Sequence, residues 1–372
     1  MLHGSPGRTI EVWEANPIAT LSETINPVQG HLPEALVYQD AIRRTNGKVL
    51  GAGGTPDAKE TVALSACYEI DPITEAISAT GSLGSPRWEA GGLVMLNHGE
   101  VLIAGGVGPE DNALTSCDLY DSVKKSWAWT GAMAVARRSG SRLLLGDGRV
   151  LAVGGWDGEG NLLNQCELYE PDSRSWSRTG NLNVARKGAS YLMMAGYAAV
   201  AIGGEDRTGQ FAPPEVFDPA RERWEIISSP KVAPLAMGLP GNALLVVGGF
   251  DPEDMVLASC ERYDLATDTW TPAASLPRPR FEALSPDSEI VRLPDGKILI
   301  AGGAAGSKSR DGHPTSAAIL YDPDADAWTT APALPIPRRR QSAIVLADGR
   351  VLLVAGEDDR GPTSRIQIYD LR

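Results

Sequence analysis

Residues 100–106 read EVLIAGG, an apolar run that ends in a pair of glycines. The same pattern recurs as KVLGAGG (48–54), RVLAVGG (149–155), AAVAIGG (198–204), ALLVVGG (243–249) and KILIAGG (297–303). A seventh copy, RVLLVAG (350–356), keeps the second glycine and has Ala355 in place of the first. The glycine pairs are spaced by about 50 residues, a period that predicts a repeat architecture in which neighbouring units stack on one another.

Each repeat carries the signals of four short strands. Five of the apolar runs follow a turn-forming dipeptide: Asn46-Gly47, His98-Gly99, Asp147-Gly148, Asp295-Gly296 and Asp348-Gly349. We predict two-residue hairpin turns there, with positive φ at both positions, so that an inner strand precedes each run. An aromatic residue and, seven positions later, a tryptophan follow the glycines in five repeats: Tyr120/Trp127, Tyr169/Trp176, Phe217/Trp224, Tyr263/Trp270 and Tyr321/Trp328. Continuously apolar strands suit sheets that are covered on both faces.

The two ends of the chain complete the count of strands. The last repeat stops at Tyr369-Asp370-Leu371-Arg372, which leaves no residues for its fourth strand. Residues 10–13, with Trp13 at the tryptophan position, fit that outer strand. We predict that they close a ring of seven four-stranded blades, because an open blade would leave an apolar face and a sheet edge unpaired. Residues 1–372 then form a single all-β domain.

The glycine pairs, the spaced tyrosines and tryptophans, and the number of copies resemble Kelch-repeat β-propellers of the galactose oxidase-like superfamily. The resemblance extends over essentially the whole chain and implies that ligands bind at a loop-rich mouth near the axis. The family includes protein-recognition modules, copper radical oxidases, sugar epimerases and plant specifier proteins. The fold alone does not choose among these functions.

Composition narrows the choice of partners. The chain has 34 Lys and Arg against 47 Asp and Glu, a net charge of −13, which disfavours nucleic acid and anionic membranes as partners. No run of 18 apolar residues is present, and the N-terminus lacks the basic start and apolar centre of a secretion signal. We therefore expect a cytoplasmic monomer.

The long connections collect on one face of the predicted ring, and the longest are 14–33, 271–289 and 304–316. Functional residues concentrate on such loops. Directly after the glycines come Thr55, Val107, Trp156, Glu205, Phe250, Ala304 and Glu357. Arginines recur where the preceding loop enters a first strand, namely Arg87, Arg137, Arg138, Arg186, Arg280, Arg339 and Arg340. They resemble the arginines with which Kelch proteins grip acidic peptides or carboxylated ligands. The alternative is that a repeated arginine ties adjacent loops together.

Other residues at the mouth fit a binding role. Trp156 and Phe250 offer stacking surfaces if they face the mouth, or pack against a neighbouring loop if they do not. Arg207 follows two acids directly and can set a guanidinium beside a carboxylate. Acidic stretches at 110–111, 205–206, 251–254 and 357–359 can pair with the arginines or stay solvated. Whether they hold Ca²⁺ is open, although no EF-hand spacing is present.

Catalytic chemistry has weaker signals. Glu205 and Glu357 share one repeat position, and His313 lies in a long loop; these three are the candidates for proton transfer. His31 also falls in a long loop of the mouth face, but two histidines are too few for a three-histidine zinc site. The galactose oxidase type of copper site needs paired Tyr and His ligands, and the chain has no Tyr-His dipeptide. We therefore expect no metal and no cofactor.

The four cysteines occupy one repeat position. Cys67, Cys117, Cys166 and Cys260 each lie three residues before the third-strand residue at 70, 120, 169 or 263. Different blades should hold them too far apart for disulfides. We expect small, buried core residues.

Two functions remain. The first is a recognition module that binds an acidic peptide or a small anionic ligand at the mouth. The second is a metal-free enzyme of the epimerase, cyclase or lyase type that moves a proton on a carboxylated small molecule in the same place. We favour recognition, because no catalytic constellation stands out.

Overall fold

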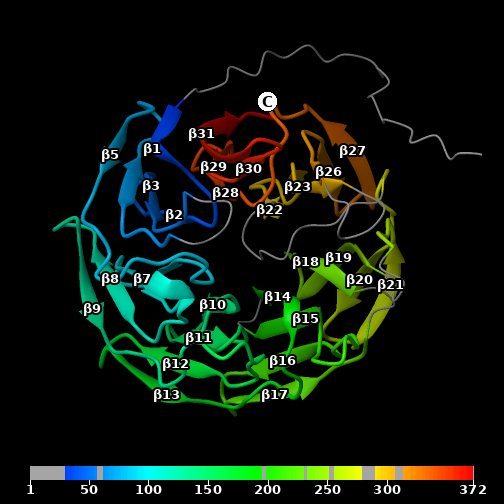
Figure 1. The fold of residues 1–372 in the computed structure, drawn as a ribbon. Helices are drawn as coiled ribbons and strands as arrows, with labels where there is room; N and C mark the ends of the chain where they lie inside the picture. The colour runs from blue at the N-terminus through cyan, green and yellow to red at the C-terminus, as the bar shows by residue number, and fades with distance from the viewer. Residues whose placement is uncertain are drawn as a thin grey trace, which may run out of the picture.

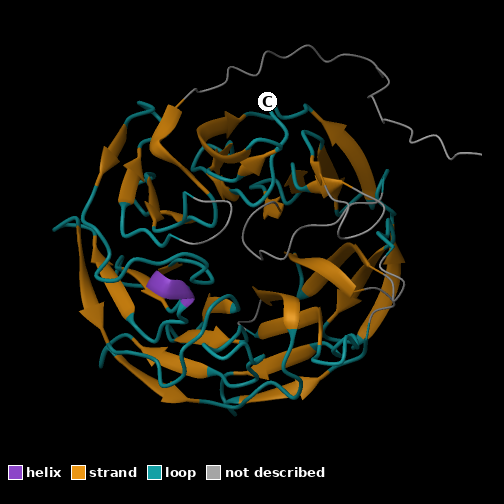
Figure 2. Ribbon diagram, viewed as in Figure 1, coloured by secondary structure: helices purple, strands orange, loops and turns teal. Residues whose placement is uncertain are grey.

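The structure is a computed structural model, a ring of β-sheets arranged around a central axis (Figure 1). It describes residues 30–56, 62–194, 198–229, 233–250, 255–278, 290–305 and 313–371. Strands and loops make up the ring, with a short 3-10 helix, η1 (Pro109–Asp111), in the loop after β7 (Figure 2). No helix in these ranges has the length and apolar character needed to cross a membrane.

Seven antiparallel sheets form the blades, which we number 1 to 7 along the chain. From the axis outward, blade 1 is β2(Asp40–Arg43), β3(Val49–Ala52), β4(Cys67–Ile70), β5(Ile77–Ala79); blade 2 is β6(Val94–Met95), β7(Val101–Ala104), β8(Cys117–Asp121), β9(Ser126–Thr130); and blade 3 is β10(Ser141–Leu144), β11(Val150–Val153), β12(Glu167–Glu170), β13(Ser175–Arg178). Blade 4 is β14(Lys187–Met193), β15(Ala199–Glu205), β16(Glu215–Asp218), β17(Arg223–Ile226).

Blades 5 to 7 repeat this order. Blade 5 is β18(Ala233–Leu239), β19(Ala243–Phe250), β20(Cys260–Asp264), β21(Thr269–Ala273); blade 6 is β22(Ile290–Arg292), β23(Ile298–Ala301), β26(Ala318–Asp322), β27(Ala327–Ala331). Blade 7 is β28(Ser342–Val345), β29(Val351–Val354), β31(Gly361–Tyr369) and β1(Gly30–Leu36). Two short pairings lie in loops: β24(Ala304–Ala305) with β25(His313–Pro314), and β30(Glu357–Asp358) with β31. The predicted seven-bladed propeller with four-stranded blades is confirmed.

The chain closes the ring as predicted, but with a different segment. The outer strand of blade 7 is β1, which pairs antiparallel with β31 through Gly30↔Ile366 and His31↔Arg365. Residues 10–13, which we predicted for this position, lie outside the described residues. Leu32 and Leu36 of β1 are buried in a cluster shared by blades 7 and 1. This outer strand therefore packs through leucines and contains no tryptophan.

The turns between first and second strands differ from the predicted two-residue hairpins. Gly47 has φ 84°, whereas Asn46 is not among the residues with positive φ. The Gly47 N–H donates to the Arg44 carbonyl, and the Asn46 side chain accepts from the Lys48 N–H. Such a turn is of the three-residue type, a type I turn whose last residue is a left-handed glycine. The Asn or Asp before the glycine thus acts through its side chain, as an acceptor for the backbone two residues on.

The glycine pairs are required by both conformation and space. Gly105 and Gly106 have φ of 72° and 101°, which L side chains rarely adopt. A Cβ on Gly105 would also lie 2.6 Å from the Arg137 carbonyl oxygen. In blade 7 the chain tolerates Ala355 at the equivalent place, with φ 59°. The pair therefore lets the loop that leads to the next blade approach the end of the second strand.

Aromatic pairs and apolar strands hold neighbouring blades together. In five blades the third-strand aromatic lies opposite the outer-strand tryptophan, with ring centroids 4.7–5.2 Å apart. Trp176 of blade 3 packs on a cluster that contains Val94, Leu102 and Cys117 of blade 2. All four cysteines are buried free thiols, and burial raises the pKa of Cys166 to about 11. The sequence-based assignment of the cysteines to the core is confirmed.

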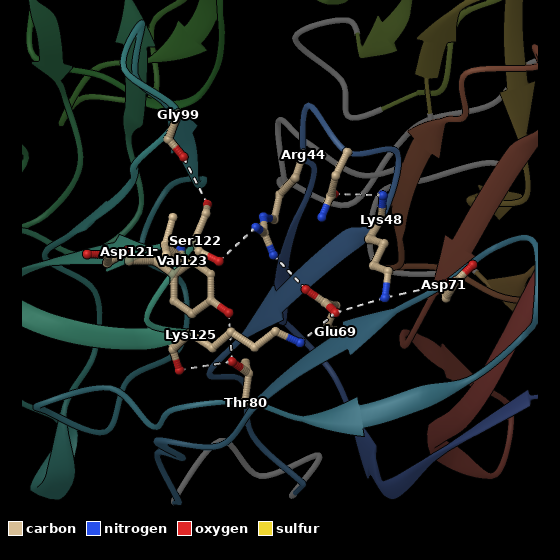
Figure 3. A network of polar contacts seen from close by, with 12 residues as sticks. Arg44, Lys48, Glu69, Asp71, Thr80, Gly99, Asp121, Ser122, Val123 and Lys125 are labelled. Carbon is tan, nitrogen blue, oxygen red and sulfur yellow. Dashed lines mark hydrogen bonds and ion pairs between the residues drawn. The ribbon is translucent and has the colours of Figure 1, made fainter.

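Polar contacts also join blades. The Glu69 carboxylate of blade 1 is buried and accepts from Arg44 (2.6 Å), Lys48 (3.1 Å) and, from blade 2, Lys125 (3.3 Å) (Figure 3). Burial alone would raise the pKa of Glu69, but the hydrogen bonds from the two lysines outweigh it and lower that pKa. A buried carboxylate shared by several cations is thus one of the ties across a blade boundary.

Candidate functional site

The two predicted sets of mouth residues meet in pairs. In five blades the residue after the glycines forms a backbone bridge with a residue where the chain enters the first strand of the same blade: Val37↔Thr55, Trp88↔Val107, Arg138↔Trp156, Lys187↔Glu205 and Arg339↔Glu357. We call the face formed by these loops the mouth. Lys187, Trp88 and Val37 were not among the residues predicted for it. The pairing of the two sets means that each mouth position presents side chains from two loops.

Three of the predicted arginines do not face the mouth. Arg87, Arg137 and Arg186 are buried, and each guanidinium bonds a carboxylate on the third strand of the next blade. Arg87 Nη2 lies 2.9 Å from Asp118 Oδ2, and Arg137 Nη2 lies 3.0 Å from Glu167 Oε1; Arg186 pairs with Glu215. Their Nη1 atoms donate to the carbonyls of Gly105, Gly154 and Gly203.

Arg137 shows how this arrangement joins two blades. Its carbonyl accepts from the Gly106 N–H and its own N–H donates to the Leu114 carbonyl, both in blade 2. Its guanidinium meanwhile bonds Gly154 and Glu167 of blade 3. The alternative that we weighed, a repeated arginine that ties adjacent loops, therefore describes Arg87, Arg137 and Arg186. Since they are buried within the ring, we do not retain them as ligand contacts.

Arg138, the next residue along, has a different environment. It is partly exposed, and its Nη1 lies 2.8 Å from Oδ1 of Asp111, whose side chain is 68% exposed. Its backbone pairs with that of Trp156, which is half-buried. Trp156 in turn bridges to Leu162, whose carbonyl lies 3.5 Å from Nη2 of the exposed Arg207.

These contacts connect two blades at the mouth. The loop that holds Arg207 also holds Phe211, which is 39% exposed and bridges to Glu205. We call Arg138, Trp156, Arg207 and Phe211 the blade 3–4 patch. It combines two guanidinium groups with two partly exposed aromatic rings, the residue types that most often supply binding energy at interfaces.

A second group lies where blade 7 meets blade 1. Arg339 Nε lies 2.7 Å and Arg340 Nη1 3.4 Å from the same oxygen of Glu357, which is nearly buried. The Arg340 guanidinium also lies over the Tyr38 ring, at 5.1 Å from its centroid. The Tyr38 ring contacts Trp88 at a centroid distance of 5.4 Å. This group is a packed set of cations and aromatics, and two of its members, Tyr38 and Trp88, were missed by the sequence analysis.

The structure does not bring the candidate catalytic residues together. Glu205 lies in blade 4, 3.3 Å from Lys187, whereas Glu357 lies in blade 7. His313 begins β25, is exposed, and lies 4.0 Å from Asp359. His31, predicted in a loop, lies in β1, where its Nδ1 is 3.0 Å from Ser364 Oγ. The two glutamates that share a repeat position therefore lie in different blades, whereas His313 contacts Asp359, two residues after Glu357.

Two predicted residues cannot be placed. The donor residues that can be placed do not support a metal centre. Arg280 lies outside the described residues, and Phe250 ends β19 with its side chain outside them. Within the described ranges no three His, Cys, Asp or Glu side chains gather as metal ligands would. His31 and His313 bond to different partners on different strands. The donor set therefore does not fit a copper site of the galactose oxidase type.

Sequence reasoning missed Arg338. The buried arginines follow a leucine or methionine by four residues, as in Leu83/Arg87, Met133/Arg137 and Leu182/Arg186, and this offset assigns Arg338, after Leu334, to the buried set. Arg338 is indeed fully buried. The signal was present in the sequence, but the run of three arginines at 338–340 obscured the register.

Comparison with known proteins agrees with this architecture. The Kelch motif model matches residues 137–183 and 233–277. Kelch-like protein terF of Aspergillus terreus is 31% identical over 149 residues, which cover 37% of this chain and 31% of that protein. Kelch-like protein 34 of Homo sapiens is 31% identical over 200 residues, which cover 42% of this chain and 31% of that protein. The chain thus spans about a third of the length of these relatives.

Solved structures share the fold. A fungal alcohol oxidase of the AA5 family in complex with copper superposes with a TM-score of 0.72 at 15% identity, covering 92% of this chain and 75% of its own. YjhT superposes with a TM-score of 0.54 at 14% identity, covering 92% and 95%. At such low identity these two show the fold alone. With seven four-stranded blades and Kelch motifs matched at residues 137–183 and 233–277, the chain is a seven-bladed β-propeller that carries Kelch motifs.

Proposed function

We propose that this propeller is a recognition module whose mouth binds an acidic peptide segment at the blade 3–4 patch. The observation that carries the proposal is the pairing of Arg138 with Trp156 on adjacent backbone segments at the mouth. A carboxylate can bond the guanidinium while an apolar side chain of the same peptide packs on the indole. The similarity to Kelch-like proteins supports a role in protein binding.

The ion pair of the patch can be exchanged for a bond to a carboxylate of a partner. Arg138 is held by Asp111, whose side chain is 68% exposed, and exposed ion pairs contribute only about 0–1 kcal/mol. A carboxylate of the partner can therefore replace Asp111 at little cost. The buried pair of Arg137 and Glu167, by contrast, cannot be exchanged without opening the blade.

Binding would combine charge with apolar contact. Arg207 reaches back across the blade boundary to the carbonyl of Leu162, whose backbone bridges to Trp156, so we expect both guanidinium groups to be within reach of one bound peptide. Phe211 adds a second ring at the edge. Because the protein as a whole carries a net charge of −13, a peptide with a few acids beside an aromatic or aliphatic residue fits better than a highly charged polyanion.

Peptide display against the purified protein tests the proposal. We expect selected peptides to be enriched in Asp and Glu next to an apolar residue. Their affinity should fall as the salt concentration rises, and Trp156→Ala should lower it by about tenfold or more. A matched control is Trp129→Ala, which removes an exposed tryptophan of the outer strand β9. Selection of basic peptides, or equal losses in both variants, would contradict the proposal.

A further inference from the structure

Blade 7 lacks a counter-ion that blades 2, 3 and 4 possess. In those three blades a buried arginine meets a carboxylate placed two residues before the third-strand aromatic: Asp118, Glu167 or Glu215. In blade 7 the aromatic is Tyr369, and the residue two positions earlier is Gln367. A neutral amide therefore stands where the other blades have a negative charge.

Arg338 nevertheless has the same place in its loop as Arg137. Its carbonyl accepts from the Gly303 N–H at 2.9 Å and its N–H donates to the Thr315 carbonyl at 3.2 Å. Arg137 makes the same two bonds within blade 2. The register of the sheet is also the same, because Gln367 lies opposite Leu353 on the second strand as Glu167 lies opposite Ala152. The backbone of Arg338 thus stands toward blade 7 as that of Arg137 stands toward blade 3, but Nη1 of Arg338 lacks the carbonyl partners that Nη1 of Arg137 has.

The donors at this position are unsatisfied. Nε and Nη1 of Arg338 and Nε2 of Gln367 are buried and have no hydrogen-bond partner in the described part of the chain. Arg338 is 1% exposed and Gln367 5%. Burial lowers the pKa of Arg338 to about 10, with Arg365 adding to the effect and Asp358 opposing it, so the group is still charged at neutral pH. Leaving buried donors of a charged group unsatisfied is costly, and proteins rarely do so.

We propose that a small monovalent anion, of the size and charge of chloride, binds in blade 7 between the guanidinium of Arg338 and the amide of Gln367. It would supply the negative charge that a carboxylate supplies in blades 2, 3 and 4. The anion is a structural ligand that joins the loop after blade 6 to the last blade. This inference is independent of the mouth and of the peptide proposed to bind there.

The repeat supplies its own test variants. Gln367→Glu gives blade 7 the carboxylate that blade 3 has, and Glu167→Gln gives blade 3 the amide that blade 7 has. Thermal unfolding is followed in sodium chloride, sodium bromide and sodium gluconate at constant ionic strength, so that general screening is the same throughout. Gluconate serves as the control, because it is too large for a buried site.

We expect the unfolding temperature of the wild-type protein to rise by about 2 °C or more when chloride replaces gluconate from 10 to 300 mM. The Gln367→Glu variant should lose this dependence and unfold at higher temperature in gluconate than the wild type. The Glu167→Gln variant should be more dependent on chloride than the wild type. Equal stability of the wild type in chloride and gluconate, or equal chloride dependence in Gln367→Glu, would overturn the proposal.

Crystals grown in bromide provide a second measurement, which does not depend on the folding of any variant. An anomalous peak within hydrogen-bond distance of Arg338 Nε or Nη1 is the expected result. A water molecule at that place, with no anomalous signal, would contradict the proposal.

Discussion

Arg137 and Arg138 are neighbours in sequence, yet they occupy opposite environments. Arg137 is buried and bonds Glu167 of the next blade, whereas Arg138 is partly exposed and bonds the exposed Asp111. Successive side chains of an extended segment point to opposite sides, so one arginine enters the sheet and the other reaches the mouth. The comparison separates the arginines that build the ring from those that can bind a partner.

The same contrast holds at the junction of blades 6 and 7. Arg338 is buried, while Arg339 and Arg340 share an oxygen of Glu357 at the mouth. A repeated arginine position is therefore not one functional class. Its members must be sorted by whether the guanidinium itself is buried, as in Arg137 and Arg338, or partly exposed, as in Arg138, Arg339 and Arg340.

The largest effect should follow from removing a buried arginine. Arg137→Met leaves Glu167 charged and buried, and it also removes the donor that bonds the Gly154 and Gln165 carbonyls. We expect the free energy of unfolding to fall by roughly 3–5 kcal/mol, as measured by denaturant titration. A loss below about 1 kcal/mol would mean that this pair does not hold blades 2 and 3 together.

A second change at the same pair should recover part of that loss. In Arg137→Met with Glu167→Gln, the amide oxygen can still accept from one of the N–H groups of Ala134 and Val135, which bond different oxygens of the carboxylate in the wild type. No uncompensated charge remains, so we expect the double variant to be more stable than Arg137→Met by about 1–3 kcal/mol. Additive losses in denaturant titration would show that charge is not the origin of the effect.

The smallest effect concerns the altered glycine pair. Ala355 has φ 59°, in the region where the other six copies have glycine. Ala355→Gly should relieve this strain and raise the free energy of unfolding by about 0.5–1 kcal/mol. The greater conformational entropy of glycine in the unfolded chain reduces this gain. As a control, Gly105→Ala should destabilise, because a Cβ there would lie 2.6 Å from the Arg137 carbonyl oxygen. Destabilisation by Ala355→Gly would show that the alanine is not strained.

Most of the fold could be predicted from the sequence because its determinants are local and repeated. Glycine pairs and aromatic spacings recur in each blade, so that single exceptions such as Ala355 do not obscure them. The closing strand was harder, because Trp13 matches the spacing of the outer strand while β1 carries only leucines at that place. No repeated motif marks β1 as the outer strand. Only its pairing with β31 identifies it.

The site was predictable in position but not in detail. The sequence places arginines at the entry of five of the seven first strands, and the offset of four residues from a leucine or methionine, as in Met133 and Arg137, marks the buried one. The acid that it bonds lies two residues before the third-strand aromatic, as Glu167 precedes Tyr169. That acid lies about 30 residues from its arginine, so the pairing emerges only once strand register is known.

The most direct test of the account is a charge exchange at the mouth. Arg138→Glu should weaken the binding of a selected acidic peptide by about tenfold or more, while changing the free energy of unfolding by less than about 0.5 kcal/mol. A peptide in which the contacting acid is replaced by Lys should restore the affinity in that variant alone. The control is Arg221→Glu, an exposed arginine in the turn between β16 and β17. Restored affinity in Arg138→Glu is the predicted result; unchanged binding by that variant, or an equal loss in Arg221→Glu, would contradict the account.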